Sequence, residues 1–290
     1  MKRTKARLRG VTIRRDAHSL AAQRAIVSAL FFAITLILPS TARAQKDCES
    51  LKSFTYPQTT IVSAELDNGG KYTTKDILSL TFANLPASCR VNAQIKPTGD
   101  SDINIEVWLP LSKELPNGRY NGSYLGTGSG GYGGDFFGSE LAQGINNGFA
   151  TANTDMGTNP LTPGPLPMPV WADHLVGHPE KWSDFAWRST HLMTEFSKAL
   201  IKEFYGAPAN HSYFAGCSTG GQQALKEATR FPNDYDGILA GAPAYNRTHL
   251  LAFLVAQYGS MFPSDTTIAR YFFRSSEPCE DQYPPTSRRS

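Results

Sequence analysis

The chain has 290 residues, of which 40% are hydrophobic and 18% are charged, and its formal net charge is +3. This balance is typical of a globular protein and excludes an intrinsically disordered chain. The length is sufficient for one large domain with a sizeable buried core. Basic residues gather before residue 16 and the remainder is slightly acidic, so the charge does not indicate nucleic-acid binding.

The first 44 residues have the pattern of an export signal. A basic stretch precedes an apolar run over residues 25–38, and the Ala-Arg-Ala sequence at 42–44 offers a cleavage site with small residues. We therefore predict a signal peptide over residues 1–44 and a secreted or periplasmic protein that begins near Gln45 and has no membrane association after cleavage. The alternative is a membrane anchor, but the apolar run is shorter than the ~20 residues that a spanning helix needs.

Export permits disulfide bonds, and the chain has 4 cysteines. Cys48 and Cys89 both lie in the N-terminal part of the mature chain and are the expected pair. Cys217 lies inside a glycine-rich motif, and Cys279 has no evident partner. Spacing alone does not fix the pairing of these two.

The first half of the mature chain reads mainly as short strands. Residues 45–100 and the alternating segment 103–109 have strand character. The next predicted elements are a strand over 119–126, a glycine-rich loop over 126–138, a helix over 139–147 and a strand over 148–153. Residues 158–170 hold five prolines and are predicted to be irregular.

The second half alternates between helices and strands. The predicted order is a helix over 184–205, a strand over 211–215, a helix over 220–230 and a strand over 236–240. This alternation predicts an α/β fold with a mostly parallel sheet and helices on both faces. Periodicity is lost after Gln257, so residues 258–290 are predicted to be an irregular tail, either an ordinary terminus or the product of a shifted reading frame.

The strongest chemical signal is the segment from Gly216 to Gly220, which fits the pattern G-x-S-x-G between a predicted strand and a predicted helix. A sharp turn at this place would hold the hydroxyl of Ser218 above the sheet edge as a nucleophile. The same turn would aim the backbone N–H of Thr219 at an oxyanion. A serine hydroxyl is a poor nucleophile at neutral pH, so a histidine must take its proton.

The glycine-rich loop (residues 126–138) is the second signal. It follows an early strand, where α/β-hydrolases place the other N–H of the oxyanion hole, and we predict Gly130 or Gly131 as that donor. Loss of one such donor typically costs about 3 kcal/mol of transition-state stabilisation. The alternative, a phosphate-binding loop, lacks the lysine of a G-K-[ST] ending.

Longer stretches of the sequence resemble the tannase and feruloyl esterase family, which also includes a polyester-monomer hydrolase. The resemblance covers most of residues 103–250, and its most specific part is GCSTGG followed by GAPA. The segments that carry it are YLGTGSGGYGG (124–134), GFATANTDMG (148–157), DFAWRSTHLMTEFSKALIKEFYG (184–206), SYFAGCSTGGQQALKEATRFPNDYDGILAGAPA (212–244) and YNRTHL (245–250).

This resemblance implies a serine carboxylic-ester hydrolase that forms an acyl-enzyme on Ser218, with phenolic esters such as galloyl or feruloyl esters as small-molecule substrates. It implies an α/β-hydrolase fold over residues 45–257. In that family the cysteine before the nucleophile, here Cys217, bonds to a cysteine directly after the catalytic histidine. The Cys48–Cys89 pair also resembles a family bridge. A large lid that often holds calcium shapes the acyl pocket of the family.

The sequence departs from the family pattern beyond the nucleophile. The only histidine after Ser218 is His249, and no His-Cys dipeptide occurs. We interpret His249 as an ordinary helix or loop residue, so the triad acid and histidine, the lid and its calcium are expected to be missing. A fold incomplete at its C-terminus, a free Cys217 thiol, little or no esterase activity and no bound metal or cofactor would follow. A catalytically incomplete fragment or pseudoenzyme is thus the alternative function.

Other polar residues have weaker interpretations. We read Asp155 as a brace for the loop near the nucleophile. The acidic residues that flank the last predicted strand, Asp234 and Asp236, read as turn residues. We interpret His174 and His178 as surface residues. Together with Asp173 they offer metal-ligating groups, but nothing in the sequence fixes their geometry.

Overall fold

The computed structural model describes residues 45–74, 79–158 and 175–261. The predicted signal peptide, most of the proline-rich segment and the tail after residue 261 lie outside this part. No helix in the part that is described combines the length and apolar character needed to cross a membrane.

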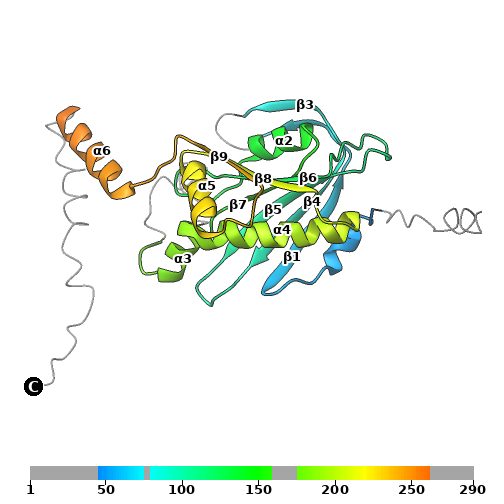
Figure 1. Ribbon diagram of the computed structural model, residues 1–290, viewed down its shortest axis with the longest axis horizontal. Coiled ribbons are helices and arrows are strands. Elements are labelled where there is room, and N and C mark those ends of the chain that lie inside the picture. The colour runs from blue at the N-terminus through cyan, green and yellow to red at the C-terminus, as the bar shows by residue number, and fades with distance from the viewer. Residues whose placement is uncertain (1–44, 75–78, 159–174, 262–290) are drawn as a thin grey trace, which may run out of the picture. The chain divides into compact units, whose positions relative to one another are not determined.

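Nine strands and several helices make up this part of the chain (Figure 1). The strands are β1 (Thr59–Asp67), β2 (Gly70–Thr73), β3 (Thr81–Leu85), β4 (Ser88–Ile95), β5 (Ile103–Pro110), β6 (Ser123–Thr127), β7 (Ala150–Thr154), β8 (His211–Cys217) and β9 (Gly237–Gly241). The helical elements are η1 (Glu49–Ser53), α2 (Gly138–Asn146), α3 (Pro179–Ser183), the π-helical turn η3 (Asp184–Arg188), α4 (Ser189–Tyr205), α5 (Thr219–Arg230) and α6 (Arg247–Met261).

The main sheet has seven strands in the order β1-β4-β5-β7-β6-β8-β9. The pairs from β7 to β9 are parallel, whereas β5 is antiparallel to both of its neighbours. Strand β4 therefore runs in the same direction as β7, β6, β8 and β9, and only β1 and β5 oppose them. Five of the seven strands thus run in one direction, in a mixed sheet whose three parallel pairs join β7, β6, β8 and β9.

Helices cover both faces of this sheet, as the alternation along β5 requires. Ile103, Ile105, Val107 and Leu109 point into one core cluster, which they share with the apolar side of α4. Trp108 points the other way, against Leu141, Ala142 and Ile145 of α2. The prediction of an α/β fold with two covered faces is therefore confirmed (Figure 1).

Several predicted element boundaries differ from those of the structure. The strand predicted from residue 119 begins only at Ser123, because Gly122 has a φ of +87° and the side chain of Asn121 accepts a hydrogen bond from the Ser123 N–H at 2.8 Å. Such a side-chain turn competes with strand pairing. Helix α6 continues past Gln257 to Met261, where an irregular tail was expected to begin.

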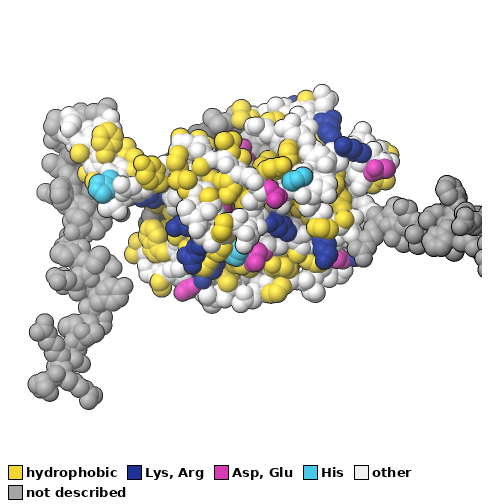
Figure 2. Space-filling model, in the orientation of Figure 1, with side chains coloured by type: hydrophobic (Ala, Val, Ile, Leu, Met, Phe, Trp, Pro, Cys, Tyr) yellow, Lys and Arg dark blue, Asp and Glu magenta, His cyan; other side chains and the backbone are white. Residues whose placement is uncertain are grey.

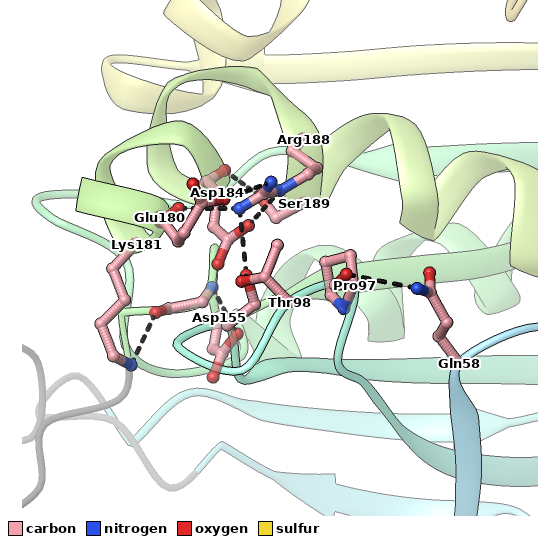
Figure 3. A network of polar contacts seen from close by, with 11 residues as sticks. Gln58, Pro97, Thr98, Asp155, Glu180, Lys181, Asp184, Arg188 and Ser189 are labelled. Atoms are coloured by element: carbon pink, nitrogen blue, oxygen red, sulfur yellow. Dashed lines mark hydrogen bonds and ion pairs between the residues drawn. The ribbon is translucent and has the colours of Figure 1, made fainter. Parts of the chain in front are cut away.

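The helix predicted over residues 184–205 begins with the π-helical turn η3, and a polar network surrounds this turn (Figure 3). Arg188 donates hydrogen bonds to Asp184 at 2.5 Å, to Glu180 at 2.7 Å and to Ser101 at 3.0 Å. The Asp184 side chain is fully buried, so the guanidinium is its essential counter-charge. Nearby, Lys181 donates to the backbone carbonyl of Gly157 at 3.3 Å. The network thus joins the π-helical turn to the segments around residues 101 and 157.

The exposed face in Figure 2 mixes side chains of both charges with apolar ones. Lysine and arginine do not gather there into one patch, so no single charge sign dominates that face.

Candidate active site

Ser218 lies on a sharp turn between β8 and α5, as the motif predicted. Its φ of +60° and ψ of −117° fall in a backbone region that residues other than glycine rarely adopt. The turn is held to the following strand, because the Ser218 N–H donates to the Gly241 carbonyl at 3.1 Å and the Ala244 N–H donates to the Ser218 carbonyl at 2.9 Å. The side chain of Ser218 is exposed, as a nucleophile must be.

Glycines let the chain segments around Ser218 touch through their backbones. A Cβ on Gly216 would lie 2.4 Å from the backbone of Gly220, and a Cβ on Gly128 would lie 2.4 Å from the Gly220 Cα. A Cβ on Gly221 would lie 2.3 Å from the Gly241 carbonyl oxygen. The glycine-rich loop therefore packs directly on the Ser218 turn, which explains why both motifs need glycine at these positions.

Two sets of N–H groups at this contact are suited to an oxyanion. Thr219 is the first residue of α5, so its N–H has no partner within the helix. The Thr219 hydroxyl donates to the Gly131 carbonyl at 2.6 Å and so holds the loop beside the helix start. The hydrogen bonds of the described residues leave the N–H groups of Gly130 and Gly131 unused, whereas the Ser129 N–H is bound to Gln223 at 2.8 Å.

Arg247 is a site residue that sequence reasoning missed. Its guanidinium donates to the Thr219 hydroxyl at 2.9 Å and to Gln222 at 2.7 Å. It also lies 5.0 Å from the ring centres of both Tyr132 and Phe185. A positive charge therefore lies beside the start of α5. No local sequence pattern could indicate this contact, because Arg247 lies beyond β9, the strand that follows the G-x-S-x-G motif.

The histidines that the structure describes are all engaged elsewhere or lie apart, and none is hydrogen-bonded to Ser218. His249 pairs with Asn246 at 2.7 Å, His178 with Asp100 at 2.6 Å and His191 with Asp234 at 2.7 Å. His211 stacks on Tyr213. Residues 173 and 174, which were considered with His178 as a metal site, lie outside the described part.

Asp155 braces the site as the sequence suggested. Its carboxylate accepts hydrogen bonds from the backbone and side chain of Asn104 and from the Gly157 N–H, all between 2.8 and 2.9 Å. Burial raises the pKa of Asp155 to about 6, against the lowering effect of these hydrogen bonds. Its backbone carbonyl accepts the N–H of Gly134 at 2.8 Å and so fixes the end of the glycine-rich loop.

The predicted Cys48–Cys89 disulfide is present, and it joins η1 to β4. Cys217 has a free and exposed thiol, and Cys279 lies outside the described residues. Asp236, which was predicted to be a turn residue, instead exchanges hydrogen bonds with Ser212 of β8, whose N–H its carboxylate accepts at 2.7 Å.

Among the described residues, one group of three or more His, Cys, Asp or Glu side chains could hold a metal ion, and it consists of His191, Glu227 and Asp234. Calcium prefers six to eight oxygen ligands, so an imidazole-containing trio does not suit it.

The chain is similar in sequence to one protein family and to several curated proteins. The family model described as tannase and feruloyl esterase matches residues 89–269. A probable feruloyl esterase B-2 of Aspergillus flavus is 37% identical over 175 residues, which cover 60% of this chain and 30% of that protein. A probable feruloyl esterase B-2 of Aspergillus terreus is 35% identical over 205 residues, covering 66% of this chain and 36% of that protein.

Solved structures agree with these relatives. The crystal structure of feruloyl esterase B from Aspergillus oryzae aligns with a TM-score of 0.60 and 32% identity, covering 70% of this chain and 38% of that one. An esterase from the same species aligns with a TM-score of 0.63 and 29% identity, covering 73% of this chain and 40% of that one. The chain spans about a third of the length of the curated relatives that it matches. It belongs to the tannase and feruloyl esterase family.

Proposed function

We propose that this chain provides the nucleophile and the oxyanion hole of a serine carboxylic-ester hydrolase that acts on aromatic esters such as feruloyl or galloyl esters. The observation that carries the proposal is the exposed Ser218 in its strained conformation at the start of α5. The same geometry serves acyl transfer in α/β-hydrolases, where the turn exposes the serine hydroxyl at the sheet edge.

In the proposed reaction the Ser218 oxygen attacks the ester carbonyl carbon. The carbonyl oxygen becomes an oxyanion, which the N–H groups of Thr219 and of Gly130 or Gly131 stabilise. Collapse of this intermediate expels the alcohol and leaves the acyl group on Ser218, and water then releases the aromatic acid. A base must accept the serine proton, and no described histidine is assigned to that role.

We further propose that the protein works outside the cytoplasm, either secreted or in the periplasm. The disulfide between Cys48 and Cys89 supports this, because such bonds persist mainly in oxidising compartments. Sequencing the N-terminus of the exported protein tests the proposal, and a chain that begins near Gln45 is the expected result.

The experiment for the esterase proposal is labelling of the purified chain with a fluorophosphonate, followed by mass spectrometry. We expect one label on Ser218, which Ser218→Ala abolishes and the control Ser53→Ala, at an exposed serine of η1, retains. Absence of label from Ser218 in the folded protein would refute the proposal.

Turnover of methyl ferulate and methyl gallate distinguishes the esterase from its alternative, a catalytically incomplete chain. That alternative is favoured by the lack of a histidine bonded to Ser218 among the described residues. Loss of one triad member leaves only the residual catalysis of the oxyanion hole and binding. Hydrolysis at ordinary enzyme rates would support the complete esterase, whereas a folded chain that neither hydrolyses these esters nor reacts at Ser218 would support the incomplete chain.

A further inference from the structure

Three titratable side chains from three segments meet on the side of α5 away from the Ser218 turn. His191 comes from α4, Glu227 from the last turns of α5, and Asp234 from the connection to β9. One possible ligand atom of each residue lies within 4.8 Å of those of the other two. His191 Nδ1 lies 2.7 Å from a carboxylate oxygen of Asp234.

Glu227 is the unusual member of this cluster, because its side chain is completely buried. Neither of its carboxylate oxygens accepts a hydrogen bond from any described residue. A buried carboxylate without a donor or counter-charge carries a large desolvation penalty. The ammonium group of Lys198, from α4, donates instead to the backbone carbonyl of Asp234. Burial and the Asp234 carboxyl raise the pKa of Glu227 and the charge of Lys198 lowers it, and among the described residues no donor satisfies its two oxygens.

The cluster is reachable from solvent on one side. The side chain of His191 is 21% exposed and that of Asp234 is 16% exposed. The imidazole stacks on the ring of Phe231 with 3.8 Å between ring centres, which fixes the plane of its nitrogens. A small ion could thus enter past two partly exposed ligands and reach the buried third.

We propose that His191, Glu227 and Asp234 bind one divalent transition-metal ion of the zinc type. One imidazole and two carboxylates from protein, with water in a remaining position, are a ligand set that Zn²⁺ accepts. The ion would bind directly to the carboxylate of Glu227, whose oxygens have no donor, and it would replace the hydrogen bond between His191 and Asp234 with two coordinate bonds.

The position of the site indicates a structural role. An ion there ties α4 to α5 and to the connection between α5 and β9. Helix α5 begins at Thr219, directly after Ser218, so the metal braces the helix that presents the candidate nucleophile. The site is independent of the ester chemistry and stands whether or not Ser218 is active.

The test is isothermal titration of the purified full chain, stripped with chelator, with Zn²⁺ alone. We expect one ion per chain, and at least a tenfold loss of affinity in Glu227→Gln, which keeps the shape of the side chain. The controls Cys217→Ser and His249→Asn remove the exposed thiol and an exposed imidazole, and they retain the wild-type affinity.

A second variant and a second readout keep the test decisive if Glu227→Gln does not fold. Asp234→Asn is expected to lose affinity in the same way, and Co²⁺ bound to the wild type is expected to show the visible absorption of a low-coordinate nitrogen and oxygen site. Absence of stoichiometric binding would overturn the proposal, as would binding that Cys217→Ser abolishes and Glu227→Gln retains. In either case Glu227 would instead stay protonated and donate a hydrogen bond to the carboxylate of Asp234.

Discussion

Ser218 adopts a conformation with a free-energy cost of about 1–3 kcal/mol for a residue other than glycine. The surrounding contacts must hold it there, and the closest of them are backbone contacts between glycines. Gly128 and Gly220 leave no room for a methyl group between the glycine-rich loop and the start of α5. The position of the serine hydroxyl therefore depends on residues that have no side chains.

Gly128→Ala is expected to destabilise the protein by about 1–3 kcal/mol, because the new methyl group meets backbone that cannot move aside. Urea unfolding followed by circular dichroism measures this loss. The matched control is Gly99→Ala, where an added Cβ meets nothing within 4 Å. Equal stability of the two variants would show that the loop does not pack on the Ser218 turn as described.

Arg247 is a positioning residue, since it acts through the Thr219 hydroxyl and the Gly131 carbonyl. Arg247→Met is expected to slow fluorophosphonate labelling of Ser218 on the order of tenfold, because small displacements of oxyanion donors reduce reactivity strongly. The labelling rate constant is the readout, since a purely structural role would change only the unfolding free energy.

The control for Arg247 is Arg230→Met, which removes another arginine that stacks on an aromatic ring, with its guanidinium carbon 3.7 Å from the centre of the Trp187 ring. This variant is expected to label at the wild-type rate. Equal slowing in both variants would assign the effect to general loosening of α5 rather than to the oxyanion donors.

Among the elements, the π-helical turn η3 depends most clearly on one ion pair (Figure 3). Asp184 is fully buried, and burial raises the pKa of its carboxyl while Arg188 lowers it. Arg188→Met is expected to cost about 3–5 kcal/mol, because it leaves a buried carboxylate without its counter-charge. Chemical denaturation of the variant measures this cost.

Asp184→Asn in the same chain separates charge from packing. The double variant is expected to recover a large part of the loss, because a neutral amide at position 184 no longer needs the guanidinium. A double variant as unstable as the sum of the two single variants would contradict the ion-pair explanation.

Local patterns predicted most elements of this fold, and their failures have physical causes. Strand alternation, helical spacing and the G-x-S-x-G turn are each encoded by residues that lie close together in the chain. The late start of β6 depends on one side-chain turn at Asn121, which hydropathy does not register. Arg247 and the trio of His191, Glu227 and Asp234 come together only through tertiary packing, across separations that a single sequence does not connect.

At the scale of the whole molecule, the N-terminal residues that the structure describes are tied down at several places. The Lys46 N–H donates to the carbonyl of Phe204 at 2.8 Å, at the end of α4. The side chain of Gln45 accepts the Ser112 N–H at 2.7 Å, just after β5. The Cys48–Cys89 bond then fixes η1 to β4, with both sulfurs in the buried core cluster.

Opening the Cys48–Cys89 bond is expected to lower the free energy of unfolding by about 4 kcal/mol, because the bond closes a loop with a sequence separation of 41. Guanidinium unfolding with and without reductant measures the difference. Cys217→Ser provides the control, since its thiol is already free and its removal should leave the effect of reductant unchanged. A reduced protein that unfolds at the same denaturant concentration as the oxidised one would mean that the hydrogen bonds of Gln45 and Lys46 hold the N-terminal segment without help from the bridge.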